Sequence, residues 1–182
     1  MNRPTRSLQP SRQQRGFSLV EGLVATAITA TLAAVGVPNL QQFRDAQAID
    51  AQFERLNASL RLARSESLTR DEVVSVCAAD PATVDSDSPE CRRGSKDWSG
   101  GWLVFVDRGQ RGQVDEGDLV LKVHQPPAGS GAVLGTQRYL TYRPAGVMLS
   151  IAAHFRFIPP GQPVVDEAVP GSALVCVNKP GK

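Results

Sequence analysis

A single carboxylate lies inside the most apolar segment of the chain. Residues 17–37 are apolar or small apart from Glu21, and about 20 such residues are enough for a helix to cross the hydrocarbon core of a bilayer. A charged carboxylate is costly in that environment, so its presence indicates a function. The chemistry open to Glu21 is the neutralisation of a positive charge brought by another group.

Three cysteines offer a second kind of chemistry. Cys77 and Cys91 flank a segment rich in Asp, Pro and Ser, and a disulfide between them would close a loop of about 15 residues, worth roughly 3 kcal/mol. Such a bond implies an oxidising compartment. Cys176 lies in the apolar run ALVCV, where we expect a buried thiol, although it could instead pair with either of the others.

The chain carries no pattern for catalysis. It has no GxSxG, no glycine-rich phosphate loop and no CxxC, and its only histidines, His124 and His154, are far apart. We therefore expect an interaction protein and not an enzyme, without a cofactor or a bound metal.

The basic character of the chain belongs to its N-terminus. The formal net charge is +2, but residues 1–16 contain four arginines and no acid, so the remainder is slightly acidic. A basic segment before an apolar one is typical of a leader held in the cytoplasm. An ordinary secretory signal has a shorter apolar region with no acid inside it, so we expect the cut before the apolar run, at Gly16.

Helical periodicity resumes directly after Pro38. Apolar residues recur every three or four positions, which predicts an amphipathic helix to about residue 69: Phe43, Ile49, Phe53, Leu56, Leu60 and Ala63. Glu66 and Arg70 have the spacing of an (i, i+4) ion pair near its end. The prediction is one long helix over 17–69, with 17–38 as its membrane-spanning half.

The pattern changes to short β-like runs after residue 70. Six runs are separated by Gly, Pro and Asp: 73–78, 101–107, 118–124, 138–144, 147–158 and 173–178. They predict an antiparallel, sandwich-like β domain over 70–182, packed on the amphipathic half of the helix. The expected fold class is α+β.

Residues 16–40 resemble the N-terminus of type IV prepilins and of the pseudopilins of type II secretion. The stretch RGFSLVE supplies the glycine before the cut, the phenylalanine after it and a glutamate as fifth mature residue. The resemblance implies that a prepilin peptidase/N-methyltransferase cuts after Gly16 and methylates Phe17. It also implies that Glu21 docks against the N-terminus of a neighbouring subunit.

The remainder resembles the GspH/FimT branch of this family. That branch has a W-x-x-GW-x-VF-x-D motif, matched here by Trp98, Gly101, Trp102, Val104, Phe105 and Asp107. We expect both tryptophans in the core or a turn, with ligand binding at Trp98 as the alternative. The turn that follows often reads D-x-N-x-N-G in the family, which suggests calcium. Here Gly109 and Arg111 replace two of the oxygen ligands, so no metal is expected.

The resemblance implies a minor pilin at the tip or initiation complex of a type IV pilus, assembled with other minor pilins on an inner-membrane platform. Its leader would lie in the cytoplasm and its β domain in the periplasm. A type II secretion pseudopilin is one alternative. Another is DNA binding, because FimT-type proteins can end in a basic G-R-x-R. This chain keeps only Lys179, Gly181 and Lys182, which predicts weak, salt-sensitive binding.

Overall fold

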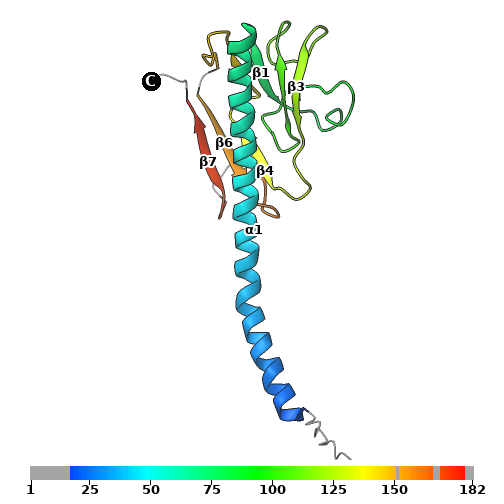
Figure 1. Cartoon of the computed structure of the whole chain (residues 1–182), viewed down its shortest axis with the longest axis vertical. Coiled ribbons are helices and arrows are strands. Elements are labelled where there is room, and N and C mark those ends of the chain that lie inside the picture. The colour runs from blue at the N-terminus through cyan, green and yellow to red at the C-terminus, as the bar shows by residue number, and fades with distance from the viewer. Residues whose placement is uncertain (1–16, 151, 166–168, 179–182) are drawn as a thin grey trace, which may run out of the picture. The chain divides into compact units, whose positions relative to one another are not determined.

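The computed structural model describes residues 17–150, 152–165 and 169–178. The helix α1 (Leu19–Arg70) precedes seven strands, shown in Figure 1: β1 (Val74–Ala78), β2 (Trp102–Val106), β3 (Leu119–His124), β4 (Ala132–Gly135), β5 (Tyr139–Tyr142), β6 (Ala153–Ile158) and β7 (Ala173–Val177). The chain divides into two compact units, Met1–Leu40 and Gln41–Lys182, so the second half of α1 belongs to the unit that contains the strands.

The end of α1 is well defined by local chemistry. The predicted ion pair between Glu66 and Arg70 is present, with 2.5 Å between its charged atoms. Asp71 follows with a φ of 57°, the left-handed conformation that commonly terminates a helix. The helix therefore ends one residue beyond the predicted boundary.

The strands form two antiparallel sheets. One has the order β3-β2-β1-β5 and the other β4-β6-β7. β1 is central, and all five of its residues are buried because both faces of its sheet are covered. Successive side chains alternate between these faces, so that Val74 and Val76 point to the main core and Cys77 to a smaller cluster beside it.

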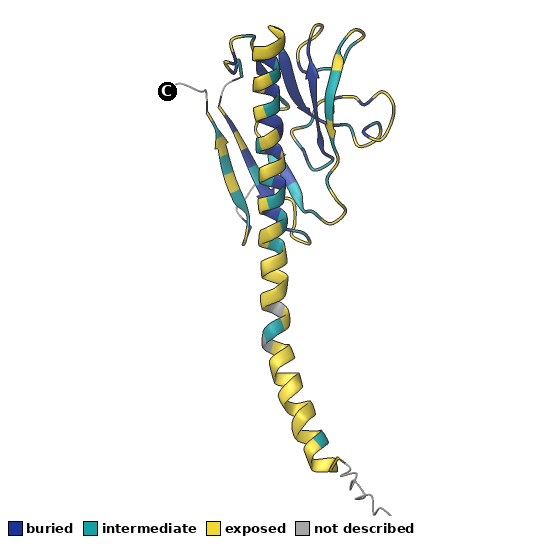
Figure 2. Cartoon of the chain, in the orientation of Figure 1, coloured by how far each residue is buried: buried dark blue, intermediate teal, exposed yellow. Residues whose placement is uncertain are grey.

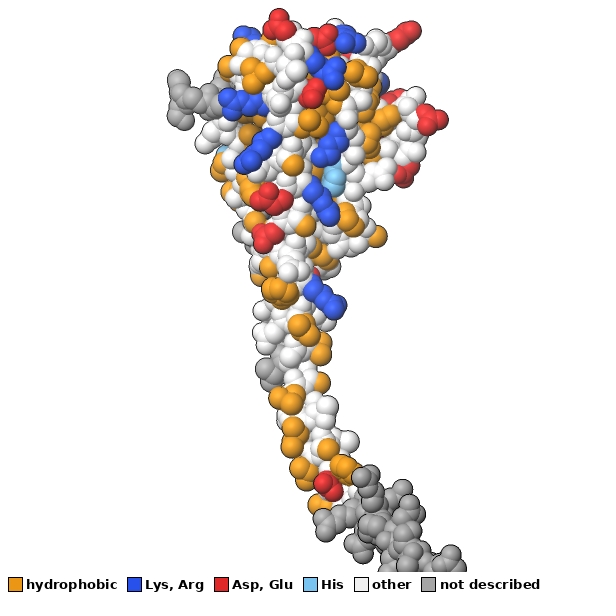
Figure 3. All heavy atoms as spheres, viewed as in Figure 1, with side chains coloured by type: hydrophobic (Ala, Val, Ile, Leu, Met, Phe, Trp, Pro, Cys, Tyr) orange, Lys and Arg blue, Asp and Glu red, His pale blue; other side chains and the backbone are white. Residues whose placement is uncertain are grey.

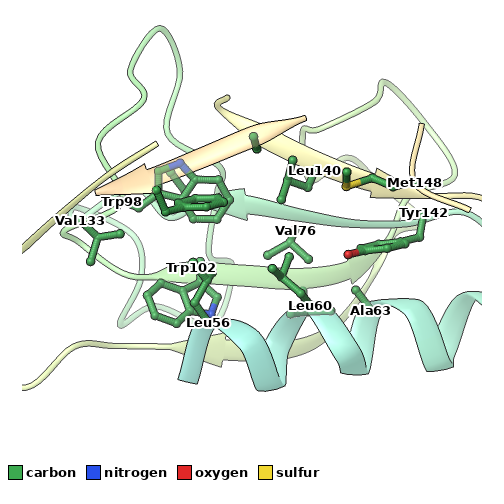
Figure 4. Close-up of a cluster of buried hydrophobic side chains, with 14 of the residues drawn as sticks. Leu56, Leu60, Ala63, Val76, Trp98, Trp102, Val133, Leu140, Tyr142 and Met148 are labelled. Carbon is green, nitrogen blue, oxygen red and sulfur yellow. The ribbon is translucent and has the colours of Figure 1, made fainter. Parts of the chain in front are cut away.

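The main core joins the second half of α1 to both sheets. Leu56, Leu60 and Ala63 of α1 lie against Val76 and Leu140 of the larger sheet (Figure 4). In the smaller sheet, the ring of Phe157 meets Phe53 edge-on at 6.2 Å. Buried and exposed positions alternate along this half of the helix (Figure 2), as the periodicity predicted. The α+β fold is confirmed.

Three details of the sequence prediction are wrong. Phe43 is 60% exposed, because the packed stretch of α1 begins further along the helix. The predicted run 147–158 is a strand only from Ala153 onward; Met148 makes an isolated bridge to Tyr142. Strand β4 was missed, because its four residues, the last of which is Gly135, are too few to show a period.

Candidate functional site

The N-terminus of the described chain places Glu21 at the start of α1. Gly16, the expected cleavage residue, lies outside the described residues, and Phe17 is 79% exposed. The carbonyl of Ser18 accepts the first helical hydrogen bond, 3.0 Å from the nitrogen of Gly22. Ser18 and Glu21 thus have the S-x-x-E spacing of a capping box. The helix dipole favours a carboxylate in this first turn.

Large apolar side chains cover α1 between its start and residue 40. All of the following are more than half exposed within the described structure: Leu19, Val20, Leu23, Val24, Ile28, Leu32, Val37 and Leu40. By length and composition this helix can cross a membrane. Exposed (yellow) positions follow each other along this stretch in Figure 2. An apolar surface of this extent needs lipid or other helices to cover it.

Three threonines in this stretch satisfy their hydroxyls within the helix. Thr26 donates to the carbonyl of Leu23 at 2.9 Å, and Thr31 to that of Ala27 at 2.9 Å. Thr29 donates to the carbonyl of Ala25. Because each hydroxyl bonds to the backbone one turn earlier, these residues do not bring unpaired polar groups into an apolar environment.

The two motif tryptophans are core residues. The indole N–H of Trp98 donates to the carbonyl of Gln137 at 2.9 Å, and its ring meets Phe155 edge-on at 5.0 Å. That of Trp102 donates to the hydroxyl of Ser59 at 2.9 Å. Both indoles are fully buried, so the structural interpretation of Trp98 holds and a ligand does not reach its ring. Figure 4 shows both side chains within the core.

The motif glycine Gly101 permits a close approach of two backbones. Its φ is 105°, and a Cβ there would lie 2.1 Å from the carbonyl oxygen of His124. No side chain fits without moving the backbone of β3 away. The glycine therefore belongs to the packing of β2 against β3.

The turn that could suggest calcium is held by its own carboxylates. Asp107 accepts a hydrogen bond from the hydroxyl of Ser75 and one of 2.9 Å from the backbone N–H of Gly112. Asp115 accepts from the N–H of Gln110 at 2.7 Å. Burial raises the pKa of Asp107, an effect that the hydrogen bonds from Ser75 and Gly112 oppose. These oxygens are engaged in shaping the loop 107–118.

His124 packs beside the second tryptophan. Its ring centroid lies 4.0 Å from that of Trp102, and its buried Nε2 has no hydrogen-bond partner within the described structure. Burial, together with the smaller effects of the charges of Arg55 and Lys122, lowers the pKa of His124 to about 4. No local sequence pattern indicates this contact, because residues 102 and 124 meet only through the register of β2 with β3.

The disulfide joins Cys77 to Cys91, the pairing that their spacing favoured. It lies in the smaller apolar cluster with Leu103 and Phe105. Cys176 is free and exposed, which corrects the expectation of a buried thiol and excludes it as the alternative partner. It is exposed because it points away from the core on an edge strand, which the apolar run could not indicate.

The predicted DNA-contacting lysines, Lys179 and Lys182, fall outside the part of the chain that the structure describes, so DNA binding by the C-terminus stays a prediction. Among the residues described, no cluster of three His, Cys, Asp or Glu side chains could hold a metal ion.

Two protein-family models match the sequence of this chain. The family described as "Type II transport protein GspH" matches residues 52–181, and the "Prokaryotic N-terminal methylation motif" matches residues 11–37. Comparison with curated proteins finds no match.

Two solved structures of one protein are similar to this chain, and the first of them shows the shared fold. The type IV minor pilin FimU of Pseudomonas aeruginosa matches with a TM-score of 0.50 and 19% identity, over 75% of this chain and 86% of that chain. A second crystal form of FimU matches with a TM-score of 0.46 and 19% identity, over 72% of this chain and 84% of that one.

Proposed function

We propose, from the premise that the chain belongs to the family of type II transport protein GspH, that it is a minor pilin incorporated at the tip or initiation complex of a type IV pilus. The chain is a minor pilin or pseudopilin with an N-terminal methylation motif. Its role is structural and not enzymatic. The proposal adds three points: the cleavage and methylation of the N-terminus, the machine that the chain joins, and its position in the filament.

The proposal rests on the position of the methylation motif relative to the start of α1. The methylation motif, residues 11–37, overlaps the start of α1, so the proposed cut after Gly16 falls two residues before the first helical residue. Glu21 then lies in the first turn of the mature helix, and the exposed apolar surface follows it directly. The same segment could therefore be cut, anchored in the membrane and packed in a filament.

The chemistry of the cut accounts for the acid in the apolar segment. Glycine at position 16 leaves the backbone open to a peptidase. Cleavage creates an α-amino group on Phe17 whose ordinary pKa is about 8, so it is mostly protonated at neutral pH. In a bundle of these helices, Glu21 of one subunit meets that ammonium group on the next. Each charge is costly alone in an apolar bundle, and together they favour one axial register.

The charges of the chain indicate its orientation. The four arginines of residues 1–16 favour a cytoplasmic leader and an inner-membrane span. The disulfide favours a β domain in the oxidising periplasm. The partners would be the prepilin peptidase/N-methyltransferase, other minor pilins and the inner-membrane assembly platform.

A secretion pseudopilin is the second candidate, because the matching family is named for type II transport. The likeness of fold to a type IV minor pilin supports the pilus. Co-isolation separates the two: the pilus is supported if the chain copurifies with sheared pili, and secretion if it is retained with secretion pseudopilins.

Substitution of Glu21 tests the docking role. Glu21→Ala should be cleaved and inserted normally but should be depleted from sheared filaments. Glu54→Ala, which removes an exposed carboxylate from the other half of α1, is the control and should incorporate normally. Normal incorporation of Glu21→Ala would refute the role given to this residue.

A further inference from the structure

Strand β7 is an outer edge of its sheet without the usual protection. Among the described residues it pairs only with β6. Its sequence, ALVCV, contains no charge and no proline, and Leu174 is 62% exposed. Edge strands normally carry charged residues or proline, or are covered by another segment, because their free N–H and C=O groups can pair with further strands. β7 thus offers unpaired backbone groups beside apolar side chains.

The other edges in the described structure are protected. The segment 96–98 bonds to the outer side of β4. The N–H of Leu149 donates to the carbonyl of Thr141 at 2.8 Å and covers β5. β3 carries Lys122, and its pairing with β2 is interrupted by a register shift. β7 therefore differs from the other edge strands of the described structure, which are covered by another segment, charged or irregular.

A groove runs between β7 and the second half of α1, which lie side by side in Figure 1. Its volume is about 360 Å³. Six apolar or aromatic residues line it: Phe53, Leu56, Leu60, Tyr142, Val175 and Val177. The groove can therefore receive the side chains of a strand that pairs with the edge.

The groove carries uncompensated positive charge. Arg61 and Arg64 line it, three residues apart and so on one side of the helix, and no acid lies among its lining residues. Neither arginine belongs to an ion pair within the described part of the chain. Figure 3 shows Lys and Arg side chains along this part of the molecule. A carboxylate on the incoming segment would supply the missing charge.

We propose that β7 and this groove bind an extended, acidic segment of another protein as an added strand. Its backbone pairs with β7, alternate apolar side chains enter the groove, and a carboxylate meets Arg61 and Arg64. A second copy fits less well, because antiparallel pairing of two β7 strands places both arginine pairs on the same face of the joined sheet. This site uses no residue of the first half of α1, residues 19–40, and does not depend on the proposed pilus role.

Synthetic peptides test the site on the full processed chain in detergent. The probe alternates Val and Thr and carries two Glu residues; one matched peptide has Lys in their place, and another is N-methylated at alternate amides to block strand pairing. The Glu peptide should bind roughly tenfold more tightly than the Lys peptide. It should also slow hydrogen exchange of the amides of residues 173–177, and the N-methylated peptide should not.

Two double variants separate charge from pairing. Arg61→Gln with Arg64→Gln should abolish the preference for the Glu peptide, while Arg44→Gln with Arg55→Gln, equal in charge and outside the groove, should preserve it. All four side chains are exposed, so folding should persist. Equal binding of the Glu and Lys peptides, or unchanged exchange in 173–177, would overturn the proposal. So would spontaneous dimers linked through Cys176, which would identify a second copy as the occupant.

Discussion

The indole N–H of Trp102 donates a 2.9 Å hydrogen bond to the hydroxyl of Ser59, joining β2 to α1 across 43 residues of sequence. Ser59 in turn donates to the carbonyl of Arg55 at 2.9 Å. Both side chains are fully buried. A polar residue on the apolar face of the helix thus satisfies the polar atom of the family's second motif tryptophan, and the pair fixes the helix against the sheet.

Removal of this hydroxyl should destabilise the protein. Ser59→Ala leaves a buried indole N–H without a partner, which costs about 1–3 kcal/mol in the free energy of unfolding. Ser65→Ala, an exposed change six residues later in the same helix, should have little effect. Urea unfolding followed by tryptophan fluorescence measures both, because both tryptophans lie in the core. Equal stabilities would show that the bond contributes nothing.

The two kinds of cysteine should behave differently. Replacing Cys77 and Cys91 together by Ala removes the closure of a loop of about 15 residues and should cost roughly 3 kcal/mol. Cys176→Ala alters an exposed, unpaired side chain and should change stability by less than about 0.5 kcal/mol. Urea unfolding under non-reducing conditions compares them. A large loss in the Cys176 variant would contradict the observed pairing.

His124 should make the fold less stable in mild acid. Its pKa is lowered from 6.5 to about 4 in the folded chain, so the unfolded chain binds the proton more readily. The stability associated with the neutral ring is complete above pH 6.5 and is lost as the pH falls toward 4. His124→Phe keeps an aromatic ring beside Trp102 and removes the titration.

Thermal unfolding across that pH range measures the effect. The melting temperature of His124→Phe should fall less between pH 6.5 and 4 than that of the parent chain. His154→Gln, which changes the exposed histidine, should follow the parent. Parallel curves for all three proteins would show that His124 does not carry the dependence.

Two glycine substitutions separate backbone strain from steric conflict. Gly101 and Gly117 both have positive φ, 105° and 92°. A Cβ at Gly117 meets nothing within 4 Å, so Gly117→Ala should lose only the conformational cost, about 1–3 kcal/mol. Gly101→Ala also drives a Cβ against the carbonyl of His124 and should lose clearly more. Similar losses in urea unfolding would contradict the close approach of β2 and β3.

The sequence predicted most elements and only part of the contacts. The long helix, six of the seven described strands and the buried motif tryptophans followed from periodicity and resemblance, because each has a strong local pattern. Strand β4, the exposure of Cys176 and the contact of His124 with Trp102 did not. They depend on which strand becomes an edge and on the register between strands, which no local pattern encodes. Ser59 was missed because it is a polar residue on an apolar face.

Glu21 likewise shows that the sequence predicts an element but not the contacts of its residues. The sequence predicted a helix that begins at residue 17, and in the structure α1 begins at Leu19 with Glu21 in its first turn. Its proposed partner belongs to another subunit, so neither the sequence nor the fold of one chain contains that contact. The open edge at β7 likewise became visible only when the sheet order was known.

Intact-mass analysis of the chain extracted from membranes of a host that makes prepilin peptidase tests the central claim most directly. The predicted mass is that of residues 17–182 with one disulfide and one added methyl group, and fragmentation should locate the methyl group on the nitrogen of Phe17. A chain that retains residues 1–16, or one that is cut at another position, would contradict the account.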